Sequence, residues 1–307
     1  MEQKRTDLAR EPAGGREAFD VSVTIVSYNN KRDIVACLES LLSHERQSGL
    51  RLQLFVVNNS QTENCKDLEE RFPVTVLQME SNKGFGGGHN SAIPHLRSRY
   101  HVVLNPDILF RMPVFEKLVK YLNENSGVGA LAPLIVDADG NLQGVYRREL
   151  TIGDLICRYL PHPFCETARC KKKRFFHEMR DVNKQSPFAC EFIQGSFLVF
   201  PTEVFKNLGG FDERFFMYAE DADLCKRIRK MGKAVKCLPD CKVVHKWEKA
   251  SHRSLKLLMI HFSSLVKYFC KRKFTNGGGT CLDRPVPFAP STSCISFGFP
   301  RTAWRFA

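Results

Sequence analysis

The sequence predicts an α/β fold with a mostly parallel central sheet flanked by helices, and two observations point to it. In the first half of the chain, short apolar runs alternate with amphipathic stretches, which is the pattern of strand-helix-strand units. The 307 residues are 43% hydrophobic and 26% charged, as in globular proteins, and are enough to bury a sizeable core. These values exclude a fibrous, collagen-like or wholly disordered protein.

The first half is expected to contain strands and helices in turn. Apolar runs predict four buried strands, at 21–28, 51–58, 74–79 and 100–104. Amphipathic stretches predict helices at 31–44, 62–72 and 113–123. A glycine-rich turn over 84–88 and a short helix interrupted by Pro94 are expected between the third and fourth strands. Such a unit places a ligand site at the carboxyl ends of its strands.

The second half has a less regular pattern. Strands are expected at 128–136, 190–200 and 234–238, and a helix over 220–231 that Gly232 ends. Residues 158–188 show no sustained period, so we expect a mobile loop there that orders over a substrate. The predicted organisation is a flexible N-terminus (1–20), a catalytic domain (21–252) with a donor half (21–125) and an acceptor half (126–252), a basic amphipathic helix (253–274) and a disordered tail (275–307).

Most of the net charge of +13 lies at the C-terminal end, where residues 242–307 hold twelve basic and two acidic side chains. Within 253–274, one predicted helix side is apolar (Leu255, Leu258, Met259, Phe262, Leu265, Val266 and Phe269) and the other is basic and polar (Arg253, Lys256, Ser263, Ser264, Lys267 and Lys271). Such a helix can lie on an anionic membrane surface. The alternative is that its apolar side packs on the catalytic domain.

Cysteine content and the chain's start bear on localisation. Twelve cysteines are too few for a disulfide scaffold, and the first twenty residues lack the apolar core of a signal peptide. No run approaches the roughly 18 apolar residues of a membrane-spanning helix. We therefore expect a cytoplasmic protein, peripheral at most on the inner face of the cytoplasmic membrane.

Two motifs carry carboxylates. Asp107, in Asn105-Pro106-Asp107, follows a buried strand, where a carboxylate can hold a divalent cation against phosphates. Its alternative role is a helix cap. Glu220, Asp221 and Asp223 begin a predicted helix, whose macrodipole favours an ionised carboxylate that can act as a general base. Ordinary helix-start acidity explains these acids too, but not the aromatic run at 215–218 before them.

His245 follows an apolar pair and would ligate a metal only together with other groups. Cys237, Cys241 and His245 are evenly spaced, but steps of four residues along a strand are about 13 Å long, too far apart for shared zinc ligation. A turn at Pro239-Asp240 leaves zinc as a minor alternative. The cysteines are expected to fill the core.

The order of these motifs resembles family 2 glycosyltransferases of the GT-A fold, in particular their bacterial rhamnosyltransferase-like branch. The resemblance covers about 21–274 and is carried by residues 23–29, residues 82–90, Leu104-Asn105-Pro106-Asp107, Gly195-Ser196, residues 209–225 with Arg227, His245 and residues 261–264. It implies a Rossmann-like nucleotide-diphospho-sugar transferase fold.

The resemblance also implies roles for single residues. Asp107 and His245 would hold Mg²⁺ or Mn²⁺ on the donor diphosphate, and Asp221 would be the base, with Glu220 beside it. The donor nucleotide would lie against Ser27, Tyr28, Asn29, Asn58, Gly84, Asn90 and Asn105. Where the family usually has Asp after the second strand, this chain has Asn58, whose amide can still donate to and accept from a pyrimidine base. Asn105 supplies no further carboxylate to the metal.

The implied reaction is inverting, metal-assisted transfer of a sugar, with dTDP-rhamnose as favoured donor, to a saccharide or lipid-linked acceptor in cell-surface polysaccharide synthesis. Alternatives are another pyrimidine-diphosphate sugar or a catalytically impaired glycosyltransferase-like binding protein. A dinucleotide oxidoreductase is disfavoured because His89 occupies the last glycine position of the fingerprint. A specific nucleic-acid binder is disfavoured because the basic run at 171–174 has no accompanying motif.

Overall fold

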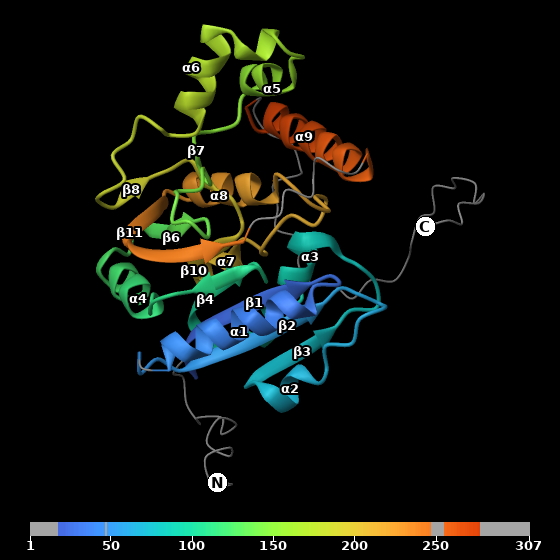
Figure 1. Ribbon diagram of the computed structural model, residues 1–307, viewed down its shortest axis with the longest axis vertical. Helices are drawn as coiled ribbons and strands as arrows, with labels where there is room; N and C mark the ends of the chain where they lie inside the picture. The colour runs from blue at the N-terminus through green and yellow to red at the C-terminus, as the bar shows by residue number, and fades with distance from the viewer. Residues whose placement is uncertain (1–17, 47, 247–254, 277–307) are drawn as a thin grey trace, which may run out of the picture.

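The central sheet of the protein has nine strands, in the order β3-β2-β1-β4-β10-β6-β11-β5, with β8 paired to β11. A computed structural model describes residues 18–46, 48–246 and 255–276 (Figure 1). Its strands are β1 (Phe19–Ser27), β2 (Leu52–Asn58), β3 (Val74–Gln78), β4 (Ser98–Leu104), β5 (Ile108–Phe110), β6 (Val128–Val136), β7 (Tyr146–Arg147), β8 (Phe188–Ala189), β9 (Phe192–Ile193), β10 (Phe197–Pro201) and β11 (Ala234–His245).

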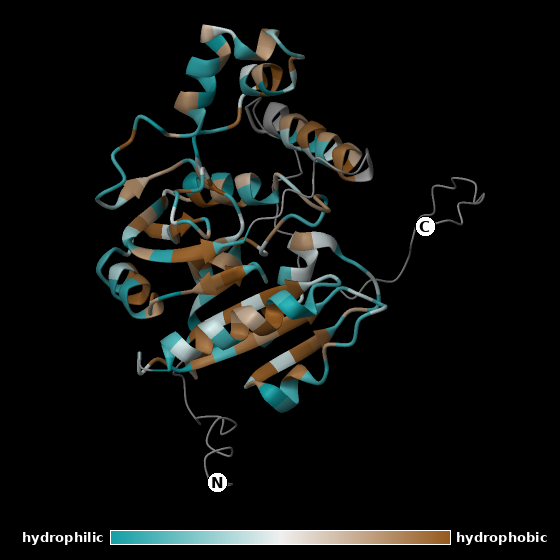
Figure 2. Ribbon diagram, viewed as in Figure 1, coloured by the Kyte–Doolittle hydropathy of each residue, from teal (hydrophilic) through white to brown (hydrophobic). Residues whose placement is uncertain are grey.

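Helices flank this sheet, and their polar sides face outward while the central strands are hydrophobic (Figure 2). The helices are α1 (Lys31–Glu45), α2 (Leu68–Arg71), α3 (Gly84–Asn90), α4 (Phe115–Glu124), α5 (Ile152–Tyr159), α6 (Ala168–His177), α7 (Thr202–Asn207), α8 (Glu220–Lys230) and α9 (Leu255–Asn276), with 3-10 turns η1 (Ile93–His95) and η2 (Phe164–Glu166). The predicted mixed α/β class is confirmed.

The first four strands are parallel and lie in the order β3-β2-β1-β4. The side chains of β1, β2 and β4 are mostly buried on both faces of the sheet, and Val23, Val56 and Val102, for example, are fully inaccessible. Such strands are near-continuous apolar runs, which is why the sequence identified them. Strand β3, which was also predicted, lies at the edge with only Val76 buried. Residues 18–20, assigned to a flexible N-terminus, instead reach into β1. Residues 1–17 of that predicted segment lie outside the described residues.

Strand β10 lies antiparallel between β4 and β6 and so joins the two halves of the chain in one sheet. Strand β11 pairs parallel with β6 and antiparallel with β5, a short strand that the sequence did not indicate. The strand expected at 234–238 was too short. Its pairing with β6 shifts register between Leu238 and Lys242, around Pro239-Asp240, and then continues to His245. The split into donor and acceptor halves stays a prediction.

The glycine-rich segment at 84–88 forms helix α3, so its assignment as a turn was wrong. Gly84 has φ +73°, and a Cβ there would lie 2.0 Å from the Phe216 carbonyl oxygen. A Cβ at Gly88 would lie 2.8 Å from Val26 Cγ1. The glycines therefore allow neighbouring segments to approach the backbone of α3 closely. Glycine has a low helix propensity, which is why the sequence predicted a turn here and not a helix. The helix expected at 62–72 is also shorter, since only Leu68–Arg71 is helical.

The segment 158–188, where a loop was expected, contains the end of α5, the turn η2 and helix α6, which the sequence did not indicate. Its ordering over a substrate stays a prediction. Helices α5 and α6 pack against each other and stand beside α9, at the end of the molecule opposite α2 (Figure 1). Thr151 caps α5 in a capping box with Asp154, and the Thr167 hydroxyl accepts from the Cys170 N–H at the start of α6. Short capped helices lack the length that reveals a helical period in sequence.

Helix α9 confirms the predicted helix, but its orientation differs from the prediction. Ser264, Leu265 and Tyr268 are buried. The Lys267 ammonium donates to the Arg214 carbonyl oxygen, and that of Lys271 lies 2.9 Å from Asp212 and 2.7 Å from Asp223. The expectation that these lysines face away from the catalytic domain was wrong. They point toward it because the carboxylates that it buries require cations nearby. The tail expected at 275–307 lies outside the described residues from 277 onward.

Among residues 18–46, 48–246 and 255–276, no helix is long and apolar enough to cross a membrane.

Candidate active site

Asp107 and His245 meet at one edge of the sheet, as expected. Antiparallel pairing of β5 with β11 sets His245 opposite Ile108, and the Lys246 N–H donates to the Asp107 carbonyl oxygen. His245 Nε2 consequently lies 3.2 Å from Asp107 Oδ2. The predicted pair of candidate metal ligands is therefore side by side in space, although 138 positions separate it in the numbering of the chain.

Gln143, which the sequence argument missed, fixes the imidazole of His245. Its amide nitrogen donates to the His245 carbonyl oxygen at 2.8 Å, so its Oε1 is the atom 2.9 Å from His245 Nδ1. That oxygen can only accept, which places a proton on Nδ1. In the neutral ring, Nε2 then points a lone pair at Asp107. No sequence signal could have identified Gln143, because it acts through a contact 102 positions away.

This arrangement fits a divalent cation. Two atoms that can ligate a metal, Nε2 of His245 and Oδ2 of Asp107, face each other, and Asp107 Oδ1 is buried without a hydrogen-bond partner. A cation would satisfy all three atoms. The part of the chain that the structure describes holds no cluster of three or more His, Cys, Asp or Glu suited to a metal, so further ligands would be substrate oxygens or water.

Asp221 begins α8 after a strained turn. Tyr218 and Ala219 have φ values of +72° and +67°, a conformation that costs energy for residues other than glycine and is concentrated at functional sites. The carboxylate of Asp221 accepts from the N–H groups of Gly195 at 3.0 Å and Ala222 at 2.7 Å. These bonds fix it in one orientation. The aromatic run at 215–218 therefore belongs to the turn that presents Asp221.

The dipeptide Gly195-Ser196 connects the two chemical groups of the site. Gly195 N–H donates to Asp221, and the Ser196 carbonyl oxygen accepts from Asn105 N–H at 2.9 Å. Asn105 follows β4 and precedes Asp107 by two positions. One dipeptide thus contacts both the base candidate and the segment that carries Asp107, which gives the Gly195-Ser196 motif a structural role.

Burial raises the pKa of Asp221, although its two N–H donors and Arg147 act in the opposite direction. The sequence argument weighed only the helix macrodipole, which favours the ionised form. Desolvation outweighs it here. A raised pKa makes the carboxylate a stronger proton acceptor once it is ionised, which suits a general base.

Glu220 has a different environment from its neighbour. It is buried, its Oε2 has no hydrogen-bond partner, and burial together with the Asp221 charge raises its pKa well above the usual range. A protonated carboxyl group cannot accept a proton. Within this pair, Asp221 is therefore the group suited to act as base.

We expect Glu220→Gln to stabilise the protein at high pH. The raised folded-state pKa means that the native state holds a proton that the unfolded chain releases above about pH 4.3, so this group's contribution to stability falls as pH rises toward the folded-state pKa. Glutamine removes that dependence. Melting temperatures at pH 4 and pH 8 measure it, with exposed Glu124→Gln as control. An unchanged difference between the two pH values would contradict the prediction.

Several predicted donor-site residues lie together where β1 and β2 end, but their side chains contact one another. The side-chain oxygen Oδ1 of Asn29 accepts from the Ser60 and Thr62 hydroxyls, and the Ser27 hydroxyl donates to Asn30 Oδ1. Asn58 is fully buried: its amide nitrogen donates to Glu63 O and Gln78, and its oxygen accepts from Ser60 N–H. A direct nucleotide contact by Asn58 would require breaking these bonds. Tyr28, 57% exposed, presents a free ring surface beside them.

Asn90 and Gly84 join α3 to the block that carries Asp221. Asn90 exchanges two hydrogen bonds with the Phe211 backbone, at 2.8 and 2.9 Å, and donates to Glu213. Phe85 N–H donates to the Phe216 carbonyl oxygen beside Gly84. These residues therefore connect the predicted donor region to the catalytic block, a role that the sequence did not indicate. The backbone N–H of Asn105 makes a hydrogen bond, whereas its side chain makes none with the described residues.

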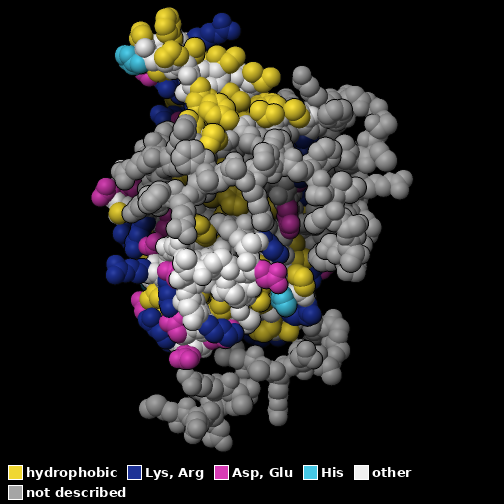
Figure 3. Space-filling model, turned by 90° about the vertical axis from the view of Figure 1, so that its right-hand side faces the viewer, with side chains coloured by type: hydrophobic (Ala, Val, Ile, Leu, Met, Phe, Trp, Pro, Cys, Tyr) yellow, Lys and Arg dark blue, Asp and Glu magenta, His cyan; other side chains and the backbone are white. Residues whose placement is uncertain are grey.

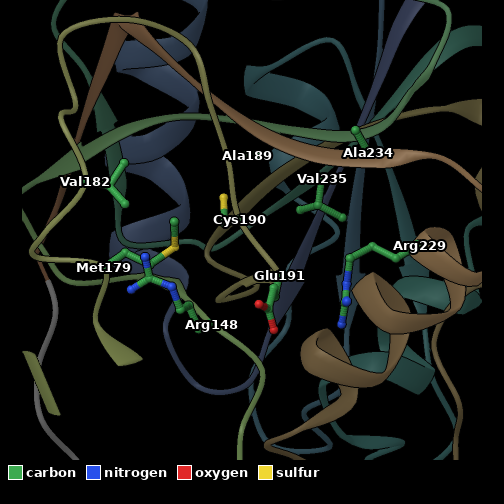
Figure 4. A pocket seen from close by; sticks show the side chains of 9 residues that line it. All are labelled: Arg148, Met179, Val182, Ala189, Cys190, Glu191, Arg229, Ala234 and Val235. Atoms are coloured by element: carbon green, nitrogen blue, oxygen red, sulfur yellow. The ribbon is translucent and has the colours of Figure 1, made fainter. Parts of the chain in front are cut away.

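A separate pocket lies at the opposite end of β11 (Figure 4). It is lined by Arg148, Met179, Val182, Ala189, Cys190, Glu191, Arg229, Ala234 and Val235. Its arginines are already paired, Arg148 with Asp181 at 2.8 Å and Arg229 with Glu149 at 3.5 Å. None of the predicted site residues lines it.

Comparison with known proteins identifies similar chains. The family model described as Glycosyl transferase family 2 matches residues 22–206, more than half of the chain. The N-acetylglucosaminyl-diphospho-decaprenol L-rhamnosyltransferase of Mycobacterium tuberculosis is 27% identical over 241 residues, which cover 73% of this chain and 75% of the relative. Rhamnosyltransferase WbbL of Escherichia coli is 22% identical over 263 residues, which cover 82% and 94%.

Solved structures share the fold at low sequence identity. GalNAc-T7, solved with UDP, GalNAc and Mn²⁺, has a TM-score of 0.55 and 16% identity; the match covers 81% of this chain and 47% of that one. The mannosyltransferase PcManGT from Pyrobaculum calidifontis, solved with GDP-Man and Mn²⁺, has a TM-score of 0.54 and 18% identity, with 89% and 70% covered.

Proposed function

Since this chain belongs to glycosyl transferase family 2, we propose that it transfers a sugar from a nucleotide-diphosphate donor to an acceptor hydroxyl by metal-assisted single displacement. The chain is a glycosyltransferase of the rhamnosyltransferase-like branch and has the GT-A fold. The observation that carries the proposal is the Asp107 and His245 pair together with the Gly195-Ser196 dipeptide. That dipeptide binds Asp221 through Gly195 N–H, and through the Ser196 carbonyl oxygen it binds the Asn105 backbone, two positions before Asp107.

In the proposed reaction, Asp221 accepts the proton of the acceptor hydroxyl as its oxygen attacks the anomeric carbon. The bond from that carbon to the diphosphate oxygen breaks, and the configuration inverts because only one displacement occurs. Gly195 and Ala222 N–H groups orient Asp221, and Gln143 orients His245. A divalent cation held by Asp107 and His245 would stabilise the negative charge of the departing diphosphate.

We favour Mn²⁺ over Mg²⁺ for this site, since Mg²⁺ strongly prefers oxygen ligands and His245 offers an imidazole nitrogen. The Mn²⁺ in the two solved structures compared above is consistent with this choice. The proposed donor is dTDP-rhamnose, and the proposed acceptor a lipid-linked saccharide of cell-surface polysaccharide synthesis. The support is the similarity to the two rhamnosyltransferases, one of which is named for a decaprenol-linked acceptor.

A panel of sugar nucleotides tests this proposal. Binding of dTDP-rhamnose, UDP-N-acetylglucosamine and GDP-mannose is measured calorimetrically with Mn²⁺, with Mg²⁺ and with chelator, followed by assay of slow donor hydrolysis. We expect dTDP-rhamnose to bind most tightly and only with metal. If another sugar nucleotide bound most tightly, the donor would be assigned to that compound instead. Donor binding without turnover would favour the catalytically impaired alternative.

We also propose that the protein attaches peripherally to a membrane, through an apolar surface that combines part of the expected apolar side of α9 with α5. Helix α5 exposes Ile152, Ile156 and Tyr159 on one face, and α9 exposes Met259, Phe262 and Val266. The rings of Tyr159 and Phe262 lie 5.0 Å apart and join the two sets into one surface, which we call the α5–α9 face. Figure 3 shows hydrophobic side chains gathered at this end of the molecule.

A lipid surface is the occupant that suits the α5–α9 face. Exposed Arg169, Lys171 and Lys172 on neighbouring α6 can meet anionic headgroups, whereas Lys267 and Lys271 are held by the domain. Apolar side chains rather than the basic side of α9 would then make the attachment. A lipid-linked acceptor would be reached from the same position.

Vesicle flotation measures this attachment. We expect the protein to float with anionic vesicles, and Ile156→Ser with Phe262→Ser to weaken binding about tenfold, because two apolar side chains lose their burial. Met231→Ser, an exposed apolar residue outside the α5–α9 face, is the matched control. Equal flotation of the double variant, or loss of flotation on removing 277–307 alone, would contradict the proposal.

A further inference from the structure

Cys157 on α5 and Cys170 on α6 bring two thiols together at the contact between these helices. Their sulfur atoms lie 2.6 Å apart, and both side chains are buried. A disulfide bond is about 2.05 Å long, so only a small side-chain movement separates the two thiols from bonding distance. Neither the proposed reaction nor the α5–α9 face uses these sulfurs.

The surroundings of Cys170 favour a reactive thiolate. Cys170 lies in the first turn of α6, where Thr167 caps the helix and the macrodipole stabilises negative charge. A hydrogen bond with Cys157, another with Thr167, and the guanidinium groups of Arg174 and Arg169 lower the pKa of Cys170. The same hydrogen bond raises the pKa of Cys157. The pair therefore contains an attacking thiolate and a neighbouring thiol that can resolve the product.

Other cysteines of the described chain differ from this pair. Burial raises the pKa of Cys225, Cys237 and Cys241 to about 12, so these thiols stay protonated near neutral pH and are weak nucleophiles. Cys165 lies in sequence between the two paired cysteines, but its sulfur contacts the Glu166 carboxylate and, within the described residues, no second thiol.

We propose that Cys157 and Cys170 form a reversible intramolecular disulfide by exchange with a low-molecular-weight disulfide such as glutathione disulfide. The Cys170 thiolate attacks one sulfur of glutathione disulfide and releases one glutathione thiolate, which leaves a mixed disulfide on Cys170. The Cys157 thiol transfers its proton to that released thiolate, and its sulfur then attacks Cys170 Sγ and releases the second glutathione. Two protein thiols are thereby oxidised by two electrons, and one glutathione disulfide is reduced to two thiols.

The bond would join α5 covalently to α6. Because Tyr159 of α5 contacts Phe262 of α9, the cross-link would also restrain the segment that carries half of the α5–α9 face. The linker between the two cysteines contains η2 and the exposed Phe164. Oxidised protein should therefore resist tryptic cleavage after Arg158 and Arg169 more than reduced protein does.

The test uses the full chain, equilibrated in glutathione buffers of stepped redox potential, alkylated with N-ethylmaleimide and analysed by peptide mass mapping. We expect a 157–170 disulfide in the oxidising buffers, reversed by dithiothreitol. Cys157→Ser should accumulate glutathione on Cys170, since the resolving thiol is gone, whereas Cys170→Ser should leave Cys157 unmodified. Cys165→Ser, with unchanged disulfide formation, is the matched control.

Two results would overturn the proposal. One is alkylation of both cysteines in every buffer, and the other is a bond or mixed disulfide that forms on Cys165 in place of Cys170. Far-ultraviolet circular dichroism of each variant verifies that it is folded. The readout is a mass and does not depend on glycosyl transfer, so failure of the proposed function would leave this test intact.

Discussion

Replacing Asp221 with asparagine is expected to lower kcat about 10²–10⁴-fold while donor binding stays unchanged. Asparagine keeps the shape of the side chain, but its amide cannot take up the acceptor proton. Gly195 N–H donates to Oδ2 and Ala222 N–H to Oδ1 of the carboxylate, so the single oxygen of asparagine keeps only one of these two hydrogen bonds. Initial rates with saturating donor, together with calorimetric donor binding, measure the two effects separately. The carboxylate is needed for the proton transfer and not for holding the donor.

The pH dependence of the wild type gives a second measurement on the same residue. The base must be ionised, and burial raises its pKa, so kcat should fall as pH is lowered at a value above the ordinary aspartate pKa of about 3.9. Asp221→Asn should lose this acid limb. Exposed Glu124→Gln, the same chemical change outside the site, should keep both rate and profile. An Asp221→Asn enzyme that retained most of its activity would assign the base to another group.

Replacing Asp107 with asparagine is expected to abolish metal-dependent donor binding and to lower kcat/KM about 10³-fold, because the cation accounts for several kcal/mol of charge stabilisation. The amide is neutral and a weaker ligand than the carboxylate. Gln143→Ala should have the milder effect of a positioning residue, weakening Mn²⁺ binding about 10–100-fold by releasing the ring of His245.

Electron paramagnetic resonance titration of Mn²⁺ with nucleoside diphosphate measures both effects without turnover. Excess Mn²⁺ should restore activity to Gln143→Ala but not to Asp107→Asn, since only the former keeps both ligands. Gln53→Ala, a glutamine that contacts the chain near His95 at the opposite end of the strands, is a matched control. Equal Mn²⁺ affinity in Asp107→Asn and wild type would contradict the assigned ligand.

The sheet was predictable from sequence where strands are buried on both faces. Continuous apolar runs such as those of β1 and β4 leave few alternatives, and βαβ connections fix their parallel direction. The exceptions have local causes. Segment 84–88 is helical because Phe216 and Val26 approach its glycines closely, and α5 and α6 are too short for a period to be seen. The conformation of such segments is determined by contacts with residues distant in sequence and not by local propensity.

The candidate site was predictable only in part. The resemblance implied that Asp107 and His245 act together, but the pairing of β11 with β5 that sets them 3.2 Å apart involves a strand that the sequence did not indicate. Gln143, the αL conformation of Ala219 and the Asn90 contact with Phe211 could not be foreseen. Each depends on a partner distant in sequence. The burial that reverses the expected effect of the helix start on Asp221 is likewise a property of the assembled protein.

The position of β10 between β4 and β6 has a consequence for synthesis of the chain on the ribosome. When β4 has emerged, only β1 can pair with it, and its other edge stays open until residues 197–201 have been made. At about 5–20 residues per second, this wait lasts roughly 5–20 s. During that time an apolar strand with unpaired backbone groups is exposed, which is a template for aggregation. Nascent chains arrested about 50 residues after β4, once that strand has left the exit tunnel, should therefore recruit a chaperone that binds extended apolar segments, and chains arrested after the whole of β10 has left the tunnel should release it.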